Sequence, residues 1–335
     1  MKGILALKIR KLHCRRQKGE QPRLMRTQVY AGEALARYGF PGGHPFSTHR
    51  FGAFYKEFEK RNLARRTTVV EPANGDTDLL RSFHNEAYVS LVRQNSDRGF
   101  GLLDRGDTPA FAGCFEAALT VCATALAATD AIMAGETEAA FVPIAGLHHA
   151  QRNMAGGFCI FNDAGIVIEK LFAEYDLKRI AYVDIDAHHG DGVYYEFESH
   201  PGLIFADMHQ QYIYPGTGDA DETGTGEATG TKLNIPMRAH ADDRDFDRGW
   251  GNVLDHLKAH KPEFIILQCG ADSIAGDPIT QMEYSPASFL RAGKDLAALA
   301  HEYAGGRLLA LGGGGYNLTN IGLGWNNVIE GVLSA

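Results

Sequence analysis

The feature that most constrains the fold of this chain is a short apolar run that ends in a dense cluster of acids and histidines. Residues 180–183 are apolar, which indicates a buried strand of a parallel sheet. Asp184, Asp186, His188, His189 and Asp191 follow within eight residues, and glycines then interrupt the strand. Buried carboxylates and imidazoles are costly unless a metal ion or partner charges compensate them. The segment therefore predicts a functional site at the carboxyl end of this strand.

Two residues of the cluster have the spacing of metal ligands. Asp186 and His188 lie two positions apart, so on extended backbone their side chains point to the same face. Asp272, which follows another apolar run at 264–268, is the natural third ligand. Two carboxylates, an imidazole and an open position for water are typical of catalytic zinc. The alternative is a polar turn without a metal, although hydrogen bonds alone would hardly satisfy so dense a cluster.

The order of the predicted elements indicates one α/β domain, with a mainly parallel sheet and helices on both faces. Before residue 139 we predict strands at about 29 and at 68–70, and helices at 50–63, 76–92 and 110–134. From 139 onward we predict strands at 139–144, 179–184, 203–206, 264–268 and 307–311, and helices at 163–175, 243–260 and 286–303. No internal repeat or linker divides the chain.

Each of the later strands leads into residues that can carry chemistry. The strand at 139 leads to His148 and His149, and the strand at 307 leads to four glycines and Tyr316. Because parallel strands present their carboxyl ends at one edge of a sheet, we expect these residues to converge. Adjacent histidines suit acid/base work beside activated water, with Asp184 and Asp191 as orienting acceptors. A tyrosine hydroxyl can stabilise the oxyanion, so the set predicts hydrolysis of an amide or similar acyl bond.

Composition narrows the range of partners. The net charge of −8 argues against a nucleic-acid-binding surface. Five cysteines, an odd number without a C-x-x-C pair, fit a reduced, cytoplasmic protein. No apolar run approaches the length of a membrane span and no signal peptide opens the chain, so we expect no membrane partner. The sequence leaves the oligomeric state open.

The first 26 residues differ from the rest. They carry nine Lys or Arg residues against one Glu and show little periodicity. We predict a loosely ordered basic extension at 1–26 and a catalytic domain at 27–335, and a basic arm for an acidic partner is the alternative. The sequence assigns the extension no function.

Several motifs together resemble the histone deacetylase family, which includes bacterial acetylpolyamine amidohydrolases and acetoin-utilisation-type proteins. They are Gly146-Leu-His-His-Ala150, Gly156-Gly-Phe-Cys159, Asp184-Ile-Asp-Ala-His-His-Gly-Asp-Gly192, Tyr214-Pro-Gly-Thr-Gly218, Gln268-Cys-Gly-Ala-Asp272 and Gly312-Gly-Gly-Gly-Tyr316. The resemblance spans roughly residues 28–333, in the family's order. It implies the three-layer arginase/deacetylase fold and zinc-dependent removal of an acetyl group from an amine.

The resemblance also implies catalytic roles for the matching residues. The chain would bind one zinc ion, with Asp186, His188 and Asp272 as its ligands. The acid/base pairs would be His149 with Asp191, as general base and acid, and His148 with Asp184, as electrostatic companion. Tyr316 matches the oxyanion-binding tyrosine, and its presence favours an active deacetylase.

Substrate contacts are implied on several loops. Asp107 resembles the rim aspartate that holds the substrate backbone. Gly157-Phe158 and Tyr214 resemble the aromatic walls of an acyl-lysine tunnel. Arg50 resembles the arginine of an internal acetate-exit channel.

The family also binds structural potassium, mostly through backbone oxygens. The matching positions for an inner site are Asp184, Asp186, His188, Asp207 and Met208. Those for an outer site are Phe197, His200, Leu203 and Thr231. Asp207 replaces a small hydroxyl residue, and His200 is also unusual at its position.

The expected substrate is an acetylated protein or peptide, or a small acetylated amine. Ile279 stands where polyamine-selective relatives carry a gatekeeping Glu, so acetyl-lysine is favoured over acetylpolyamines. Two other functions are compatible with the same scaffold. One is a catalytically idle module that binds acyl-lysine or a small ligand, and the other is a two-metal hydrolase similar to arginase or agmatinase.

Overall fold

The computed structural model of the protein describes residues 25–335, so the predicted basic extension lies outside the described residues except for its last two positions. Met25 is buried in the core, and the backbone carbonyl of Arg26 accepts hydrogen bonds from the amides of Glu138 and Ala139. The folded domain therefore includes both residues.

The domain is built on a sheet of eight strands in the order β2-β1-β3-β8-β7-β4-β5-β6, and all of its pairs are parallel. The strands are β1 (Thr27–Tyr30), β2 (Thr68–Val70), β3 (Ala139–Val142), β4 (Ile180–Asp184), β5 (Leu203–Gln210), β6 (Lys232–Met237), β7 (Phe264–Gln268) and β8 (Leu308–Leu311). The parallel α/β prediction is confirmed. Strand β6 was not predicted, because it is an edge strand with polar residues and Pro236, which a central strand would not tolerate.

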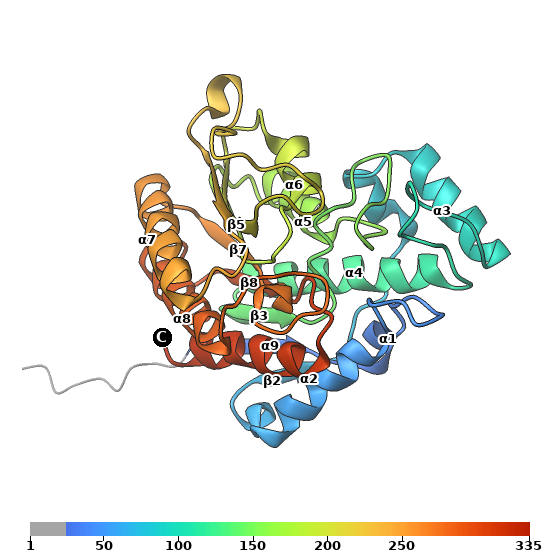
Figure 1. Ribbon diagram of the computed structural model, residues 1–335, viewed down its shortest axis with the longest axis horizontal. Helices are drawn as coiled ribbons and strands as arrows, with labels where there is room; N and C mark the ends of the chain where they lie inside the picture. The colour runs from blue at the N-terminus through green and yellow to red at the C-terminus, as the bar shows by residue number, and fades with distance from the viewer. Residues whose placement is uncertain (1–24) are drawn as a thin grey trace, which may run out of the picture.

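Helices cover both faces of the sheet (Figure 1). One layer contains α2 (His49–Lys60), α7 (Asp243–His260), α8 (Pro286–Tyr303) and α9 (Leu318–Leu333). The other contains α4 (Cys114–Met133), α5 (Asp163–Ala173) and α6 (Asp191–Phe197). The remaining helices are the short α1 (Glu33–Ala36), α3 (Glu86–Arg98) and four 3-10 turns at 63–65, 77–82, 226–228 and 271–273. These three layers are the architecture that the sequence predicted.

Helix α9 escaped prediction because its glycines obscure the helical pattern. In the fold, Gly331 of α9 and Gly293 of α8 allow the two helices to approach closely. A Cβ atom on Gly293 would lie 2.3 Å from the carbonyl oxygen of Val328, and one on Gly331 would lie 2.2 Å from that of Leu290. Residues that resemble loop formers in the sequence are therefore packing residues here.

Two predictions in the first half of the chain were wrong. The helix expected from Asp76 begins at Glu86 and is capped by Asn85, whose side chain accepts a hydrogen bond from the amide of Tyr88 at 2.8 Å. Asp76 instead caps the short 3-10 turn that precedes it. Helix α4 also reaches the length and hydropathy of a membrane span, contrary to expectation, but most of it is buried in the domain.

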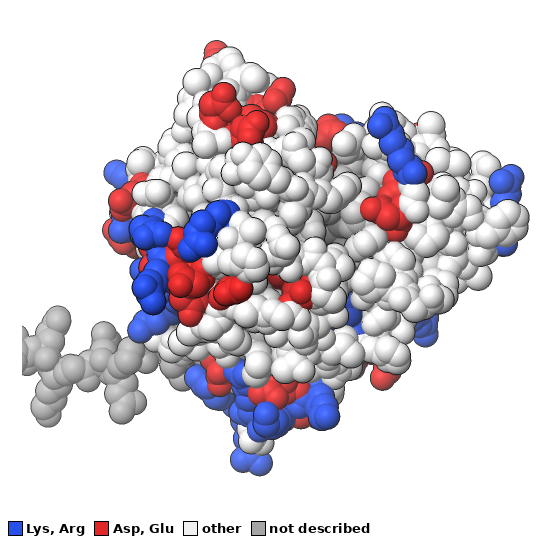
Figure 2. All heavy atoms as spheres, viewed as in Figure 1, with Lys and Arg blue, Asp and Glu red and all other residues white. Residues whose placement is uncertain are grey.

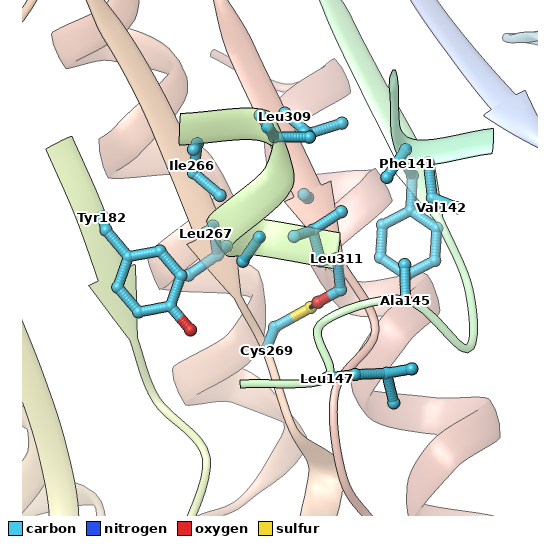
Figure 3. Packing of buried hydrophobic residues seen from close by; sticks show 14 of the residues in the cluster. Phe141, Val142, Ala145, Leu147, Tyr182, Ile266, Leu267, Cys269, Leu309 and Leu311 are labelled. Atoms are coloured by element: carbon cyan, nitrogen blue, oxygen red, sulfur yellow. Dashed lines mark hydrogen bonds between the residues drawn. The ribbon is translucent and has the colours of Figure 1, made fainter. Parts of the chain in front are cut away.

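The central strands are buried on both faces, which explains their continuous apolar sequences. Strands β4, β7 and β8 are buried at every residue, and their side chains pack with those of β3 (Figure 3). Each fully buried Leu, Ile or Phe contributes about 1.5–3 kcal/mol to the free energy of unfolding. The strand ends therefore emerge from a rigid base.

Surface charge is of mixed sign on the face shown in Figure 2. Basic side chains gather near α7 and around α2, whereas acidic side chains gather over the loop between β5 and β6. That loop contains Asp219, Asp221, Glu222 and Glu227. Neither sign dominates this face.

Candidate active site

The five strands expected to carry the site are neighbours in the sheet. Their order is β3-β8-β7-β4-β5, and because all run in the same direction their carboxyl ends meet at one edge. An inner pocket at this edge is lined by residues that follow three of them, namely Gly146, Leu147, His148, His149, Asp186, His188, Gly313, Gly314 and Tyr316, together with Phe46, Gly157 and Cys159. Segments separated by up to 270 positions in the chain, from Phe46 to Tyr316, thus contribute to one pocket.

The three predicted metal ligands lie together. Nδ1 of His188 is 3.1 Å from Oδ1 of Asp186 and 3.1 Å from Oδ2 of Asp272. One potential ligand atom from each residue lies within 4.8 Å of those from the other two. All three residues are buried, so two carboxylates face one imidazole with little help from water. Such a donor set fits a divalent metal ion.

The carboxylates are held by backbone and amide donors rather than by packing alone. Oδ2 of Asp186 accepts from the amide of Gly314 at 2.9 Å and from Nε2 of Gln268 at 2.9 Å. Oδ1 of Asp272 accepts from the amide of Ala187 at 2.9 Å. A Cβ atom on Gly270 would lie 1.8 Å from Oδ2 of Asp186, so glycine is required for this approach. The ligand positions are therefore fixed by the fold.

The proton affinities of the triad show that it stabilises positive charge. Burial lowers the pKa of His188, but hydrogen bonds and charges from Asp186 and Asp272 outweigh this effect and raise it to about 10. Burial and the charge of Asp186 raise the pKa of Asp272 to about 7. The protein thus provides at this point the electrostatic environment that a bound cation requires.

The two predicted histidines form a dyad beside the triad. Nδ1 of His148 lies 2.8 Å from Oδ2 of Asp184, and Nδ1 of His149 lies 2.6 Å from Oδ1 of Asp191. The two Nε2 atoms are 3.0 Å apart. If each ring donates its Nδ1 proton to its carboxylate, the Nε2 atoms can hydrogen-bond only when one carries a further proton. Burial and the charge of His148 lower the pKa of His149 to about 4, which leaves His149 as the neutral, accepting member.

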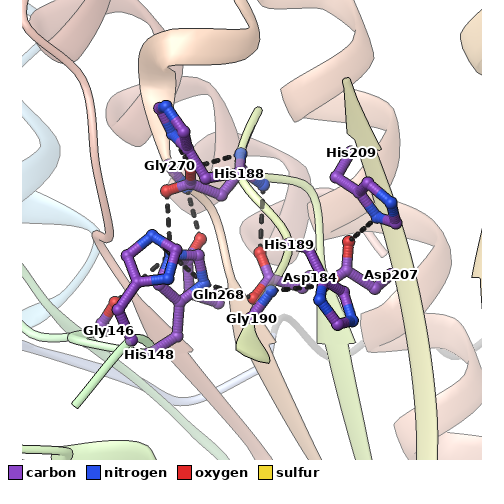
Figure 4. A network of polar contacts seen from close by, with 12 residues as sticks. Gly146, His148, Asp184, His188, His189, Gly190, Asp207, His209, Gln268 and Gly270 are labelled. Carbon is purple, nitrogen blue, oxygen red and sulfur yellow. Dashed lines mark hydrogen bonds and ion pairs between the residues drawn. The ribbon is translucent and has the colours of Figure 1, made fainter. Parts of the chain in front are cut away.

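A second polar network supports the dyad from behind (Figure 4). The hydroxyl of Tyr182 donates to Oδ2 of Asp184 at 2.7 Å. Asp207, on the neighbouring strand, accepts from the amide of Gly190 at 2.9 Å and lies 2.8 Å from Nδ1 of His209. These contacts hold the turn between β4 and α6, and therefore the side chains of both the triad and the dyad.

A cavity of about 220 Å³ leads from the surface to this pocket and contains the predicted substrate residues. Asp107, His149, Gly157, Phe158, His188, Ile213, Tyr214, Ile279 and Tyr316 line it. The ring centroid of Phe158 is 5.7 Å from that of Tyr316, and that of Tyr214 is 5.0 Å from that of His149. Tyr214 and Ile279 at the entrance are 45% and 42% exposed. The walls are aromatic and the entrance is open.

The tunnel wall at Phe158 is set by an uncommon backbone conformation. Phe158 has a φ of 68°, and its amide donates a hydrogen bond to Oγ1 of Thr108 at 3.0 Å. Its carbonyl accepts from the hydroxyl of Tyr38 at 2.7 Å. The preceding Gly157 has a φ of 50°, and a Cβ there would lie 2.3 Å from Cδ2 of His149. Tertiary hydrogen bonds thus compensate backbone strain to orient the ring.

Arg50 lies beneath the pocket, fully buried. Its Nε donates to the carbonyl of Gly315 at 2.9 Å and its Nη2 to that of Gly313 at 2.5 Å. The guanidinium stacks on Phe46 at 3.8 Å, while Nη1 has no hydrogen-bond partner among the described residues. Arg50 therefore holds the glycine segment before Tyr316 and keeps one free donor.

At the inner positions predicted for potassium, the carboxylates of Asp184 and Asp207 belong to the network already described. At the outer positions, the carbonyl oxygens of His200 and Leu203 accept hydrogen bonds from Nζ of Lys232. The carbonyl of Phe197 accepts from the amide of His200 at 3.0 Å.

Sequence reasoning missed three contributors to the site. Gln268 and Lys232 act through contacts across strands, whereas Tyr182 contacts Asp184 two positions along the same strand, and none has a motif spacing of its own. Gln268 alone had a signal, since it ends a buried strand in the same motif as Asp272.

Comparison with known proteins places the site in a family. Residues 44–332 match the histone deacetylase domain. The acetoin utilization protein AcuC of Bacillus subtilis is 33% identical over 309 residues, which cover 89% of this chain and 79% of that protein. Histone deacetylase 8 of Xenopus tropicalis is 32% identical over 277 residues, covering 80% and 73%. Among solved structures, the HDA15 HD domain matches with a TM-score of 0.85 at 26% identity, covering 92% of this chain and 89% of that one.

Proposed function

The chain belongs to the histone deacetylase family, and we propose that it is a zinc-dependent deacetylase that hydrolyses the acetyl amide of an acetylated amine. The observation that carries this proposal is the Asp186, His188 and Asp272 triad in direct proximity to the His148–His149 dyad and Tyr316. A chain that only binds acyl groups would gain nothing from burying two His–Asp pairs beside a metal site.

The donor set supports zinc as the metal. Asp186, His188 and Asp272 would hold the ion, and their environment already stabilises positive charge. The chemistry that zinc supplies in such a site is Lewis-acid polarisation of the amide carbonyl and a lowered pKa of water.

The chain's own residues account for the proton transfers. His149 accepts a proton from the attacking water at Nε2, while Asp191 at Nδ1 fixes its ring. His148, oriented by Asp184, places positive charge beside the developing negative charge. His149 then returns the proton to the leaving amine.

Tyr316 supplies the oxyanion donor. Burial, reinforced by the charges of Asp272 and Asp186, raises the pKa of Tyr316 well above its ordinary value, so the hydroxyl keeps its proton. Its hydrogen bond to the oxygen of the tetrahedral intermediate lowers the barrier, and acetate and the free amine are the products.

The tunnel favours acetyl-lysine in a protein or peptide, in the cytoplasm. Phe158 and Tyr214 offer aromatic faces to an alkyl chain. Ile279 provides no charge partner for a polycation at the entrance. Asp107, on the same rim, can accept hydrogen bonds from a substrate backbone. Acetylpolyamines remain the competing substrates to test.

The test is acetate release from acetyl-lysine peptides, longer acyl-lysine peptides and acetylpolyamines, before and after chelation. We expect acetyl-lysine to be the best substrate, activity to disappear with the chelator, and zinc to restore it. Binding of acetyl-lysine without acetate release would refute the proposal in favour of a reader. Two divalent metal ions per chain would refute it in favour of an arginase-like hydrolase.

A further inference from the structure

Lys232 is a buried lysine with a complete set of neutral acceptors. Lys232 is the first residue of edge strand β6, and only 2% of its surface is exposed. Nζ donates to the carbonyl of Leu203 at 2.8 Å, to the carbonyl of His200 at 3.1 Å and to Oγ1 of Thr231 at 2.7 Å. An ammonium group has three donors, and here each has a partner. A buried cation held by neutral oxygens is arranged as a bound monovalent ion would be.

These acceptors coincide with positions where the resemblance predicted an outer potassium site. Carbonyl oxygens directed at Nζ cannot at the same time coordinate a second cation, because the two positive charges would occupy the same space. We propose that the ammonium of Lys232 is the resident cation of the outer site, so that this chain binds no potassium there. The predicted outer site is thus replaced by a covalently attached charge, while the inner positions are unaffected.

The surroundings agree with a permanent occupant. Burial lowers the pKa of Lys232 to about 8, opposed by the charge of Glu198, so the ammonium form predominates at pH 7. The carbonyl of Thr231 is also engaged, since it accepts from the amide of Phe205 at 3.0 Å and lies 3.3 Å from Nε2 of His256. The remaining predicted ligand, the carbonyl of Phe197, already accepts from His200.

The position of Lys232 links the edge of the sheet to the active site. Of its acceptors, His200 lies in the turn between α6 and β5, and Leu203 is the first residue of β5. Helix α6 begins at Asp191, the carboxylate partner of His149, and ends at Phe197. The ammonium therefore fastens the far end of this helix to β6, as an ion would, without depending on the potassium concentration.

The test compares cation binding in the intact protein and in two variants. Crystals of the wild-type protein soaked in rubidium or thallium salts should show no anomalous peak between the carbonyls of His200 and Leu203. Lys232→Ala should show one there, because the oxygens are freed and the space is open. A peak at this place in the wild-type protein, with Lys232 displaced, would overturn the proposal. This outcome is measured on the wild-type protein and so does not depend on whether a variant folds.

Thermal unfolding gives a second readout that activity does not influence. In about 0.15 M choline chloride, Lys232→Ala should unfold about 5 °C below wild type, and KCl should recover much of that loss. Lys232→Met, whose side chain fills the space, should be destabilised without recovery in KCl. Lys258→Ala, an exposed lysine of α7, is the control. Equal effects of KCl on wild type and Lys232→Ala would contradict the proposal, because the inner positions are identical in both.

Discussion

The floor of the active site and its mouth are built differently. The floor, which comprises Asp186, His188, Asp272 and the His148–His149 dyad, is buried and lies at the ends of central strands. The mouth, which comprises Asp107, Tyr214 and Ile279, lies on loops, and all three residues are exposed. Every polar side chain of the floor has a partner within about hydrogen-bonding distance, whereas Tyr214 and Ile279 at the mouth are 45% and 42% exposed to solvent.

The difference separates chemistry from selectivity. Shifting a floor residue would strand a buried charge or clash with backbone, as the space around Gly270 and Gly314 shows. A change at the mouth meets water and costs little. We therefore expect floor variants to lose turnover and mouth variants to change substrate preference.

The largest effect is expected from loss of a metal ligand. Asp272→Asn should reduce kcat/KM by more than about 10³-fold, since several kcal/mol of transition-state stabilisation depend on the metal. Zinc content per chain, measured by elemental analysis, should fall in parallel. Asp255→Asn, an exposed residue of α7, should change neither. If the Asp272 variant kept full activity without bound metal, the floor would not be a catalytic metal site.

A slightly smaller effect is expected at the oxyanion donor. Tyr316→Phe should reduce kcat by about 10²–10³-fold with little change in KM, because the hydroxyl acts mainly in the transition state. Tyr212→Phe, at a 91% exposed tyrosine, is the matched control. A variant with unchanged kcat would show that the hydroxyl does not contact the reacting oxygen.

Gln268 tests how far the floor extends beneath its ligands. Its Nε2 donates to Asp186, and its Oε1 accepts from the amide of Gly270 at 2.7 Å. Gln268→Leu should weaken zinc binding by about 10–100-fold, the usual cost of losing such a support. A competition titration with a chelator measures this affinity, with exposed Gln94→Leu as control. Unchanged zinc affinity would show that Gln268 does not support the metal ligands.

The smallest effect is expected at the mouth. Ile279→Glu should raise kcat/KM for an acetylated polyamine, relative to a neutral acetyl-lysine peptide, by about 5-fold, as an exposed ion pair contributes about 1 kcal/mol. The gain should shrink as salt is added. Ile279→Gln controls for side-chain size and polarity. If Gln and Glu variants gave the same ratio, charge at the mouth would not select the substrate.

Prediction from the sequence succeeded where the signal was local. The apolar runs, the short spacing of Asp186 and His188, and the paired histidines each fall within a few residues. The predicted helix start at Asp76 was wrong because Asp76 and Asn85 are both good caps, and only packing decides between them. Helix α9 and strand β6 were missed because of their glycine, proline and polar residues. These residues are favourable there only through contacts with segments distant in the chain, which a local pattern does not contain.

The sequence by itself determined the parallel α/β class and which residue types follow each buried strand, because periodicity and burial are properties of short segments. Only the tertiary structure decided that Asp272 meets His188 and that Lys232 takes the acceptors of the outer potassium positions. The physical reason is that both contacts depend on the order of strands in the sheet. Two side chains distant in the chain interact only where that order places their strand ends together.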